Sequence, residues 1–123
     1  MEDKILVIDD DDLVRKSVSN VLIKAGYVVV ITENAFEAIN EIRRQSFDLI
    51  ISDIRMPGKN GVEAVREIRK LINQHSDKSK DIPIVFITGY AETSEELDAE
   101  LLGEVILKPF DLEHLLVTIR EYL

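Results

Sequence analysis

The sequence predicts an α/β fold in which a doubly wound, five-stranded parallel sheet carries helices on both faces. Short runs rich in valine and isoleucine recur along the chain, and four of the five are continuously apolar, as in strands that are covered on both sides. Between them, apolar residues repeat with a period of about 3.6, which indicates amphipathic helices. This alternation predicts βαβ units with right-handed crossovers. The predicted strands are residues 4–9, 27–32, 47–53, 82–88 and 104–108.

Five helices are expected, one after each strand. Their apolar positions are Val14, Val18, Val21, Leu22 and Ala25; Ala35, Ala38, Ile39 and Ile42; Val65, Ile68 and Ile72; Leu97 and Leu101; and Leu112, Leu115, Leu116 and Ile119. Asn34 and Asp111 are predicted to be N-caps, Asp12 is predicted to cap the first helix, and Gly26 marks the point where that helix ends. The polar stretch 73–81 is expected to be a solvated, mobile loop.

Composition limits the classes of function. The 123 residues fit a single domain, 1–123, and 24 acidic against 15 basic residues give a net charge of -9, which opposes direct binding of nucleic acid. The absence of cysteine excludes disulfides and thiolate metal sites. We find neither a signal peptide nor an apolar run long enough to cross a membrane, so we expect a cytoplasmic protein without membrane insertion.

Polar residues follow four of the predicted strands. Asp9 and Asp10 end the first strand, Asp53 the third, Thr88 the fourth and Lys108 the fifth. In an open parallel sheet the functional crevice lies at the carboxyl ends of the strands. The sequence therefore predicts that these five residues gather at one edge of an otherwise apolar sheet.

This set of residues favours phosphoryl chemistry. Three close carboxylates repel one another and need a cation, and a site made of oxygen ligands suits Mg²⁺. With the ammonium group of Lys108 and the hydroxyl of Thr88, the ion would form a cradle for a phosphoryl group, and Asp53 would be the nucleophile. Taken singly, each residue has an ordinary structural explanation, such as a turn, a cap or a surface lysine, so the interpretation depends on their joint occurrence. His75 and His114 are not expected to be ligands.

Four segments together resemble one family over essentially the whole chain. These segments are "ILVIDDDDLVR", "DLIISDIRMPGKNG", "IPIVFITGYAE" and "VILKPF". The chain is similar to the receiver domain of two-component response regulators, which implies a (βα)5 flavodoxin-like fold with Asp53 as the phosphorylated residue. The resemblance also implies that the phosphoryl group comes from a histidine kinase or a histidine phosphotransfer protein.

The same resemblance assigns the remaining site residues. Asp10 matches a direct Mg²⁺ ligand, Asp9 a ligand acting through water, and Arg55 a ligand through its backbone carbonyl. Thr88 matches the switch hydroxyl, and Lys108 matches the lysine that contacts the phosphoryl oxygens.

The chain departs from the family pattern at one switch position. Where the family usually has a tyrosine or phenylalanine, this chain has Val105, which puts the usual threonine–aromatic coupling in doubt. The resemblance also implies that the side chains of Arg55 and Tyr90 flank the path of the attacking water, so they are expected to slow autodephosphorylation. A downstream protein or an output domain is expected to bind the 89–123 face and to respond to its change of conformation.

Two other classes of function remain open at this point. A small phosphatase of the haloacid-dehalogenase type also uses a carboxylate in a D-x-D arrangement, but Leu13 replaces the expected threonine or valine and there is no room for a cap. A phosphorylation-independent interaction module would be suggested by loss of Asp10, Asp53 or Lys108, and all three are present.

Overall fold

The fold is a five-stranded parallel sheet with helices on both faces, which confirms the predicted class. The computed structural model describes residues 3–53, 63, 66, 67, 70, 82–88, 104–107 and 111–123. Within these residues the strands are Lys4–Ile8 (β1), Val28–Thr32 (β2), Leu49–Asp53 (β3), Ile84–Thr88 (β4) and Glu104–Leu107 (β5). Each strand begins and ends within two residues of its predicted bounds.

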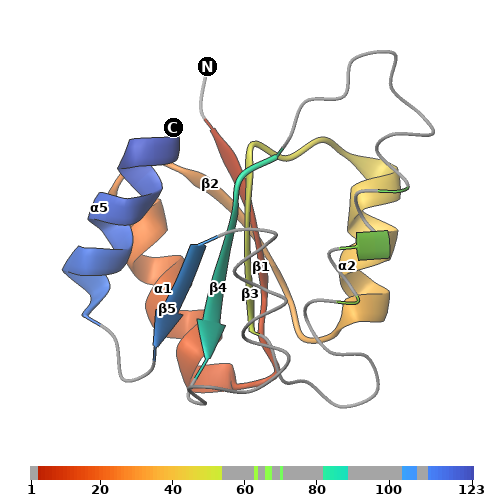
Figure 1. Ribbon diagram of the computed structural model, residues 1–123, viewed down its shortest axis with the longest axis horizontal. Helices are drawn as coiled ribbons and strands as arrows, with labels where there is room; N and C mark the ends of the chain where they lie inside the picture. The colour runs from red at the N-terminus through yellow and green to blue at the C-terminus, as the bar shows by residue number, and fades with distance from the viewer. Residues whose placement is uncertain are drawn as a thin grey trace.

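Three helices are described along their length. They are Asp12–Lys24 (α1), Ala35–Arg44 (α2) and Leu112–Tyr122 (α5). Figure 1 shows α1 and α5 on one face of the sheet and α2 on the other. Glu63, Arg66, Glu67 and Lys70 are also α-helical, in the region of the predicted third helix. The predicted fourth helix and the loop 73–81 lie outside the described residues.

The strand order is β2-β1-β3-β4-β5, with every neighbouring pair parallel. The winding direction reverses between β1 and β3, because β2 lies on one side of β1 and the later strands lie on the other. In such sheets the crevice for a ligand lies at the carboxyl ends of the strands on either side of this reversal. Asp9 follows β1 and Asp53 ends β3, so both are at this point.

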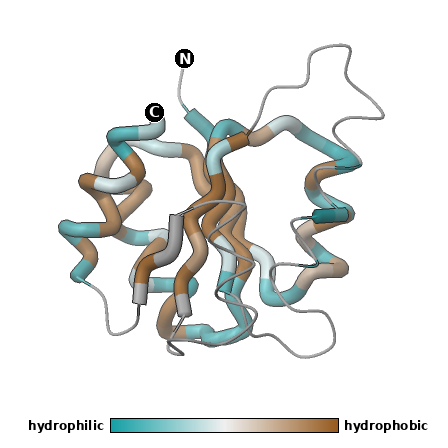
Figure 2. The backbone as a smooth tube through the Cα atoms, in the orientation of Figure 1, coloured by the Kyte–Doolittle hydropathy of each residue, from teal (hydrophilic) through white to brown (hydrophobic). Residues whose placement is uncertain are grey.

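A separate apolar core lies on each face of the sheet. Figure 2 shows the hydrophobic central strands between the two helical layers. The core beneath α2 comprises Leu6, Ile8, Ala38, Phe47, Ile50, Ile84 and Phe86. The core beneath α1 and α5 comprises Ile5, Val7, Val18, Leu22, Leu49, Ile51, Val85, Ile87, Ile106, Leu115 and Ile119. All five residues of β3 are buried, so the strand that carries Asp53 is fixed from both sides.

The helix ends agree with the sequence in three cases and differ in one. Asn34 caps α2, Asp111 caps α5, and Gly26 follows α1 with a φ of 98°, as predicted. The prediction that Asp12 caps α1 is wrong, because the cap is Asp11. Its backbone is extended, and its carboxylate accepts hydrogen bonds from the next turn, whereas Asp12 is already helical.

The strand β2 is more exposed than its apolar sequence suggested. The sequence indicated coverage on both faces, but Val28 and Ile31 are 36% and 47% exposed. The reason is the strand order, which places β2 at the edge of the sheet.

Among the described helices, none has the length and apolar character needed to cross a lipid bilayer.

Candidate functional site

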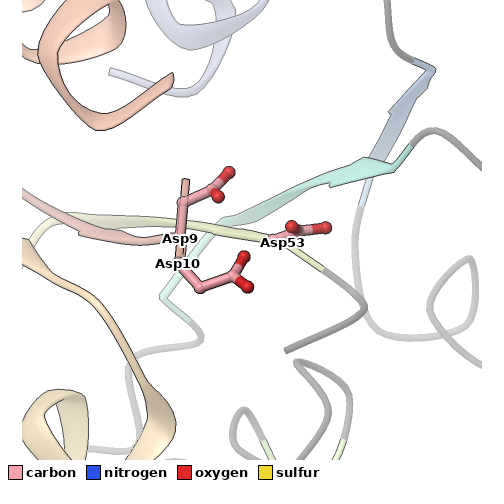
Figure 3. A group of neighbouring side chains, drawn as sticks. All are labelled: Asp9, Asp10 and Asp53. Atoms are coloured by element: carbon pink, nitrogen blue, oxygen red, sulfur yellow. The ribbon is translucent and has the colours of Figure 1, made fainter. Parts of the chain in front are cut away.

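Three carboxylates meet where β1 and β3 end. Asp9 and Asp10 follow β1 directly, and Asp53 is the last residue of β3. Ile8 is in register with Ser52, so the chain brings Asp9 beside Asp53 as the two parallel strands run out. One carboxylate oxygen from each of Asp9, Asp10 and Asp53 lies within 4.8 Å of the other two. Figure 3 shows the three side chains together at the ends of β1 and β3.

The three side chains differ in their exposure to solvent. Asp9 and Asp53 are 2% and 7% exposed, whereas Asp10 is exposed. Two unit charges at about 4 Å repel by about 4 kcal/mol at an effective dielectric near 20. Three negative charges in a partly buried site at the ends of β1 and β3 therefore favour a bound cation.

Backbone and side-chain bonds hold Asp9 in place. Its N–H donates to the carbonyl of Thr32 at 3.1 Å, which extends the pairing of β1 with β2 by one residue. Its carboxylate Oδ1 accepts from the N–H of Asp11 at 2.9 Å. Its carbonyl accepts from Nη1 of Arg15 at 2.8 Å. Asp9 thus shapes the turn that presents Asp10.

Asp53 is supported by the buried strand that it ends. It lies in register with Ile87 of β4, and the hydroxyl of Ser52 donates to its carbonyl at 2.9 Å. Ser52 is fully buried, so this bond satisfies a hydroxyl group that would otherwise be costly to bury. Asp53 is therefore held at the end of a strand whose five residues are all buried.

The other predicted site residues are described only in part. Thr88 is the last residue of β4, one residue beyond the partner of Asp53, and its backbone alone is described. Val105 lies in β5 in register with Phe86, also at backbone level. Arg55, Tyr90 and Lys108 lie outside the described residues, although β5 ends at Leu107, immediately before Lys108.

Arg15 is a residue of this region that the sequence reasoning missed. Besides its bond to Asp9, its Nη2 donates to Oδ1 of Asp12 at 2.9 Å and lies 3.9 Å from Oε2 of Glu33. Lys16 bonds the same Asp12 carboxylate and is the main cause of a lowered pKa at that group, with a smaller contribution from Arg15. The Asp12–Arg15 pair has helical i, i+3 spacing and could have been read from the sequence. The bond to Asp9 could not, because it depends on the shape of the turn.

The donor set fits a hard divalent cation. All of the carboxylate oxygens come from short side chains on two adjacent strand ends, and Mg²⁺ binds through one or two carboxylates while keeping several waters. Because Asp10 is exposed, water can reach the site. A carboxylate in such a place is also suited to nucleophilic attack on phosphorus.

Comparisons with known proteins agree with this geometry. The sequence model described as "Response regulator receiver domain" matches residues 5–120. The probable transcriptional regulator ycf29 of Pyropia yezoensis is 35% identical over 118 residues, which cover 94% of this chain and 51% of that protein. The chain therefore spans about half the length of this relative.

Two solved structures are similar over nearly the whole chain. The chemotaxis protein CheY4 of Vibrio cholerae has a TM-score of 0.86 and 31% identity, with 100% of both chains covered. The response regulator protein TrrA from Thermotoga maritima, in complex with Mg²⁺ and BeF, has a TM-score of 0.83 and 30% identity, with 98% of this chain and 99% of that chain covered. Both similarities support the fold, and neither favours the phosphatase or the phosphorylation-independent module.

Proposed function

The chain belongs to the family of response regulator receiver domains, and from this membership we propose that it accepts a phosphoryl group on Asp53 and signals by changing conformation. The donor would be a phosphohistidine of a histidine kinase or of a phosphotransfer protein. The observation that carries the assignment is the meeting of Asp9, Asp10 and Asp53 within 4.8 Å at the reversal point of the sheet.

A divalent cation is part of the proposal. Asp9, Asp10, Asp53 and the backbone carbonyl of Arg55 would hold Mg²⁺, with Asp10 as a direct ligand and Asp9 acting through water. When bound, the ion neutralises negative charge on the carboxylates and on the phosphoryl oxygens. This role agrees with the oxygen-only donor set and with the solvent exposure of Asp10.

Asp53 supplies the nucleophile. Its carboxylate oxygen forms a bond to phosphorus while the bond from phosphorus to the donor's histidine nitrogen breaks, and that nitrogen keeps the electron pair. The buried strand β3 fixes the backbone of Asp53, which favours a constant direction of approach to the phosphorus atom. Lys108 is proposed to contact the phosphoryl oxygens, since it comes directly after Leu107, the last residue of β5, in the sequence.

Thr88 is the proposed link between phosphorylation and the signal. A phosphoryl group adds about -1.5 to -2 charges and three acceptor oxygens, so a nearby hydroxyl gains a strong hydrogen-bond acceptor. The resulting bond would bias an existing equilibrium between two conformations. Val105 occupies the position where the family usually has an aromatic residue. We therefore propose that partners bind the 89–123 face according to its conformation, and that this conformation changes without the movement of an aromatic side chain.

The proposed partners are proteins, and the proposed location is the cytoplasm. The family is not one of classical enzymes, so the chemistry would be limited to the domain's own phosphorylation and slow dephosphorylation. The name "transcriptional regulator" applies to the whole of the Pyropia relative, of which this chain matches 51%. A net charge of -9 opposes direct contact between this chain and nucleic acid.

Phosphorylation by a small donor tests the proposal. With Mg²⁺ and acetyl phosphate, mass spectrometry should show one labile phosphoryl group on the chain, and Asp53→Asn should abolish it. The matched control is Asp48→Asn, just before the opposite end of β3, where asparagine keeps an oxygen that can accept from the N–H of Lys4. Equal labelling of Asp53→Asn and the wild type would refute the assignment.

A further inference from the structure

Arg15 joins three parts of the structure around the acidic turn, which is formed by residues 9–11 between β1 and α1. Its side chain is only 13% exposed. Nη1 donates to the backbone carbonyl of Asp9 at 2.8 Å, and Nη2 donates to the carboxylate of Asp12 at 2.9 Å. Nη2 also lies 3.9 Å from the carboxylate of Glu33, beyond the end of β2. One guanidinium group thus connects the end of β1, the first turn of α1 and the residues after β2.

The bond to the Asp9 carbonyl affects the position of Asp10. That carbonyl belongs to the peptide unit that joins Asp9 to Asp10, and the atoms of this unit lie in one plane. The hydrogen bond from the N–H of Asp9 to Thr32 fixes the peptide unit before Asp9. The bond from Arg15 fixes the peptide unit after it. The orientation of this plane determines where the Cα atom and the carboxylate of Asp10 lie relative to Asp53.

We propose that Arg15 is a positioning residue for the cation site, which it serves by holding the Asp9–Asp10 peptide unit so that the Asp10 carboxylate faces Asp53. The proposal rests on the proposed function, since it takes the three carboxylates to be the Mg²⁺ site. Arg15 itself would touch neither the ion nor the phosphoryl group.

If Arg15 acted through its charge alone, its removal would strengthen Mg²⁺ binding, whereas the loss of a positioning residue would weaken it. A guanidinium group close to a cation site repels the cation, so its removal should strengthen Mg²⁺ binding if only electrostatics matter. If Arg15 positions the ligand, its removal should weaken binding, because residues that orient metal ligands typically contribute about 10- to 100-fold in affinity. The direction of the change therefore separates the two roles.

Lys16 provides a matched control on the same turn of α1. Its Nζ lies 3.1 Å from Oδ2 of Asp12, and its side chain is 69% exposed. In the described part of the chain, no hydrogen bond joins Lys16 to Asp9. Lys16→Gln and Arg15→Gln remove the same charge from neighbouring positions, but only Arg15→Gln removes the bond to the Asp9 carbonyl.

The experiment is a calorimetric titration of Mg²⁺ alone, at constant ionic strength, into the wild type and the variants. Arg15→Gln should raise the Kd for Mg²⁺ about tenfold, whereas Lys16→Gln should leave it unchanged or slightly lower. Arg15→Lys keeps the charge but loses the planar fork that serves Asp9 and Asp12 together, so its Kd should also rise. This last variant retains the helix charge and tests the proposal even where Arg15→Gln fails to fold.

A second measurement separates positioning from direct participation. At saturating Mg²⁺, phosphorylation of Arg15→Lys by acetyl phosphate should approach the wild-type rate, since the reacting atoms are untouched. Wild-type Mg²⁺ affinity in Arg15→Lys, or tighter binding in Arg15→Gln, would overturn the positioning role. Absence of Mg²⁺ binding by the wild type would instead overturn the proposed function, and this inference with it.

Discussion

Asp9 combines an observed structural role with a proposed functional role in one buried residue. Its N–H, its carbonyl and its Oδ1 atom are bonded to Thr32, Arg15 and Asp11, respectively. These bonds order the turn, and a carboxylate bonded in this way has little freedom to rotate. Asp10, in contrast, is exposed and is the carboxylate of the pair that is open to water. This difference fits the proposed division between a ligand that acts through water and a direct ligand.

The persistence of the phosphorylated state is predicted to depend on Arg55 and Tyr90. By family resemblance, both large side chains are expected to flank the path of the water that would attack phosphorus. Replacing both with alanine should make loss of the phosphoryl group several times faster, because water gains access. The lifetime can be measured by following the labelled chain after the removal of acetyl phosphate.

A charge-matched control separates shielding from a general effect of charge. Arg120→Ala removes the same charge as Arg55→Ala from an exposed position in the last turn of α5. Its phosphoryl lifetime should equal that of the wild type. An unchanged lifetime in the double variant at 55 and 90 would refute the shielding hypothesis.

At the level of elements, α1 is fixed at both ends by local chemistry. Asp11 accepts from the N–H groups of Leu13 and Val14 at its start. At its end, the N–H of Gly26 donates to the carbonyl of Ile23, and Gly26 takes a φ of 98°. The acidic turn precedes this helix directly, so a well-defined helix start also defines the turn.

The conformation of Gly26 leads to a prediction about stability. A Cβ atom at this position would meet no atom within 4 Å, so the effect of Gly26→Ala comes from the backbone conformation alone. A left-handed conformation costs an L-residue about 1–2 kcal/mol, and we expect Gly26→Ala to lower the free energy of unfolding by that amount. Gly26→Asn should cost less, because asparagine adopts positive φ more readily. Urea denaturation measures both, and an alanine variant as stable as the wild type would contradict the prediction.

At the scale of the whole molecule, the sequence predicted the order of strands and helices, because residues that are buried on one face recur at regular intervals along the sequence. The apolar pattern did not predict that β2 is an edge strand. Ile31 of β2 and Val7 of β1 are both apolar strand residues, and their exposure differs because of the strand order. The cap of α1 was misplaced by one residue because four successive aspartates offer equivalent side chains, and backbone conformation selects Asp11. The site carboxylates were visible as breaks in apolar runs. Arg15 was not, because its bond to Asp9 requires the folded turn.

The net charge of the chain makes the response of stability to salt informative. A charge of -9 means that any cation reduces self-repulsion, with an effect that follows ionic strength. A specific site adds a separate term, because an ion that binds only the folded chain stabilises it by about 2.7 kcal/mol at a concentration of 100 times its Kd. The two contributions can be separated at constant ionic strength.

We predict that replacing NaCl with MgCl₂ at constant ionic strength raises the free energy of unfolding of the wild type and has much less effect on Asp10→Asn. Without Mg²⁺, Asp10→Asn should be at least as stable as the wild type, because one of three mutually repelling carboxylates has lost its charge. Glu121→Gln, in the last turn of α5 and exposed, changes the net charge equally and should respond to Mg²⁺ as the wild type does. Urea denaturation with and without MgCl₂ provides all of these values. Equal stabilisation of Asp10→Asn and the wild type would show that Mg²⁺ acts through general screening and that Asp10 is not a ligand.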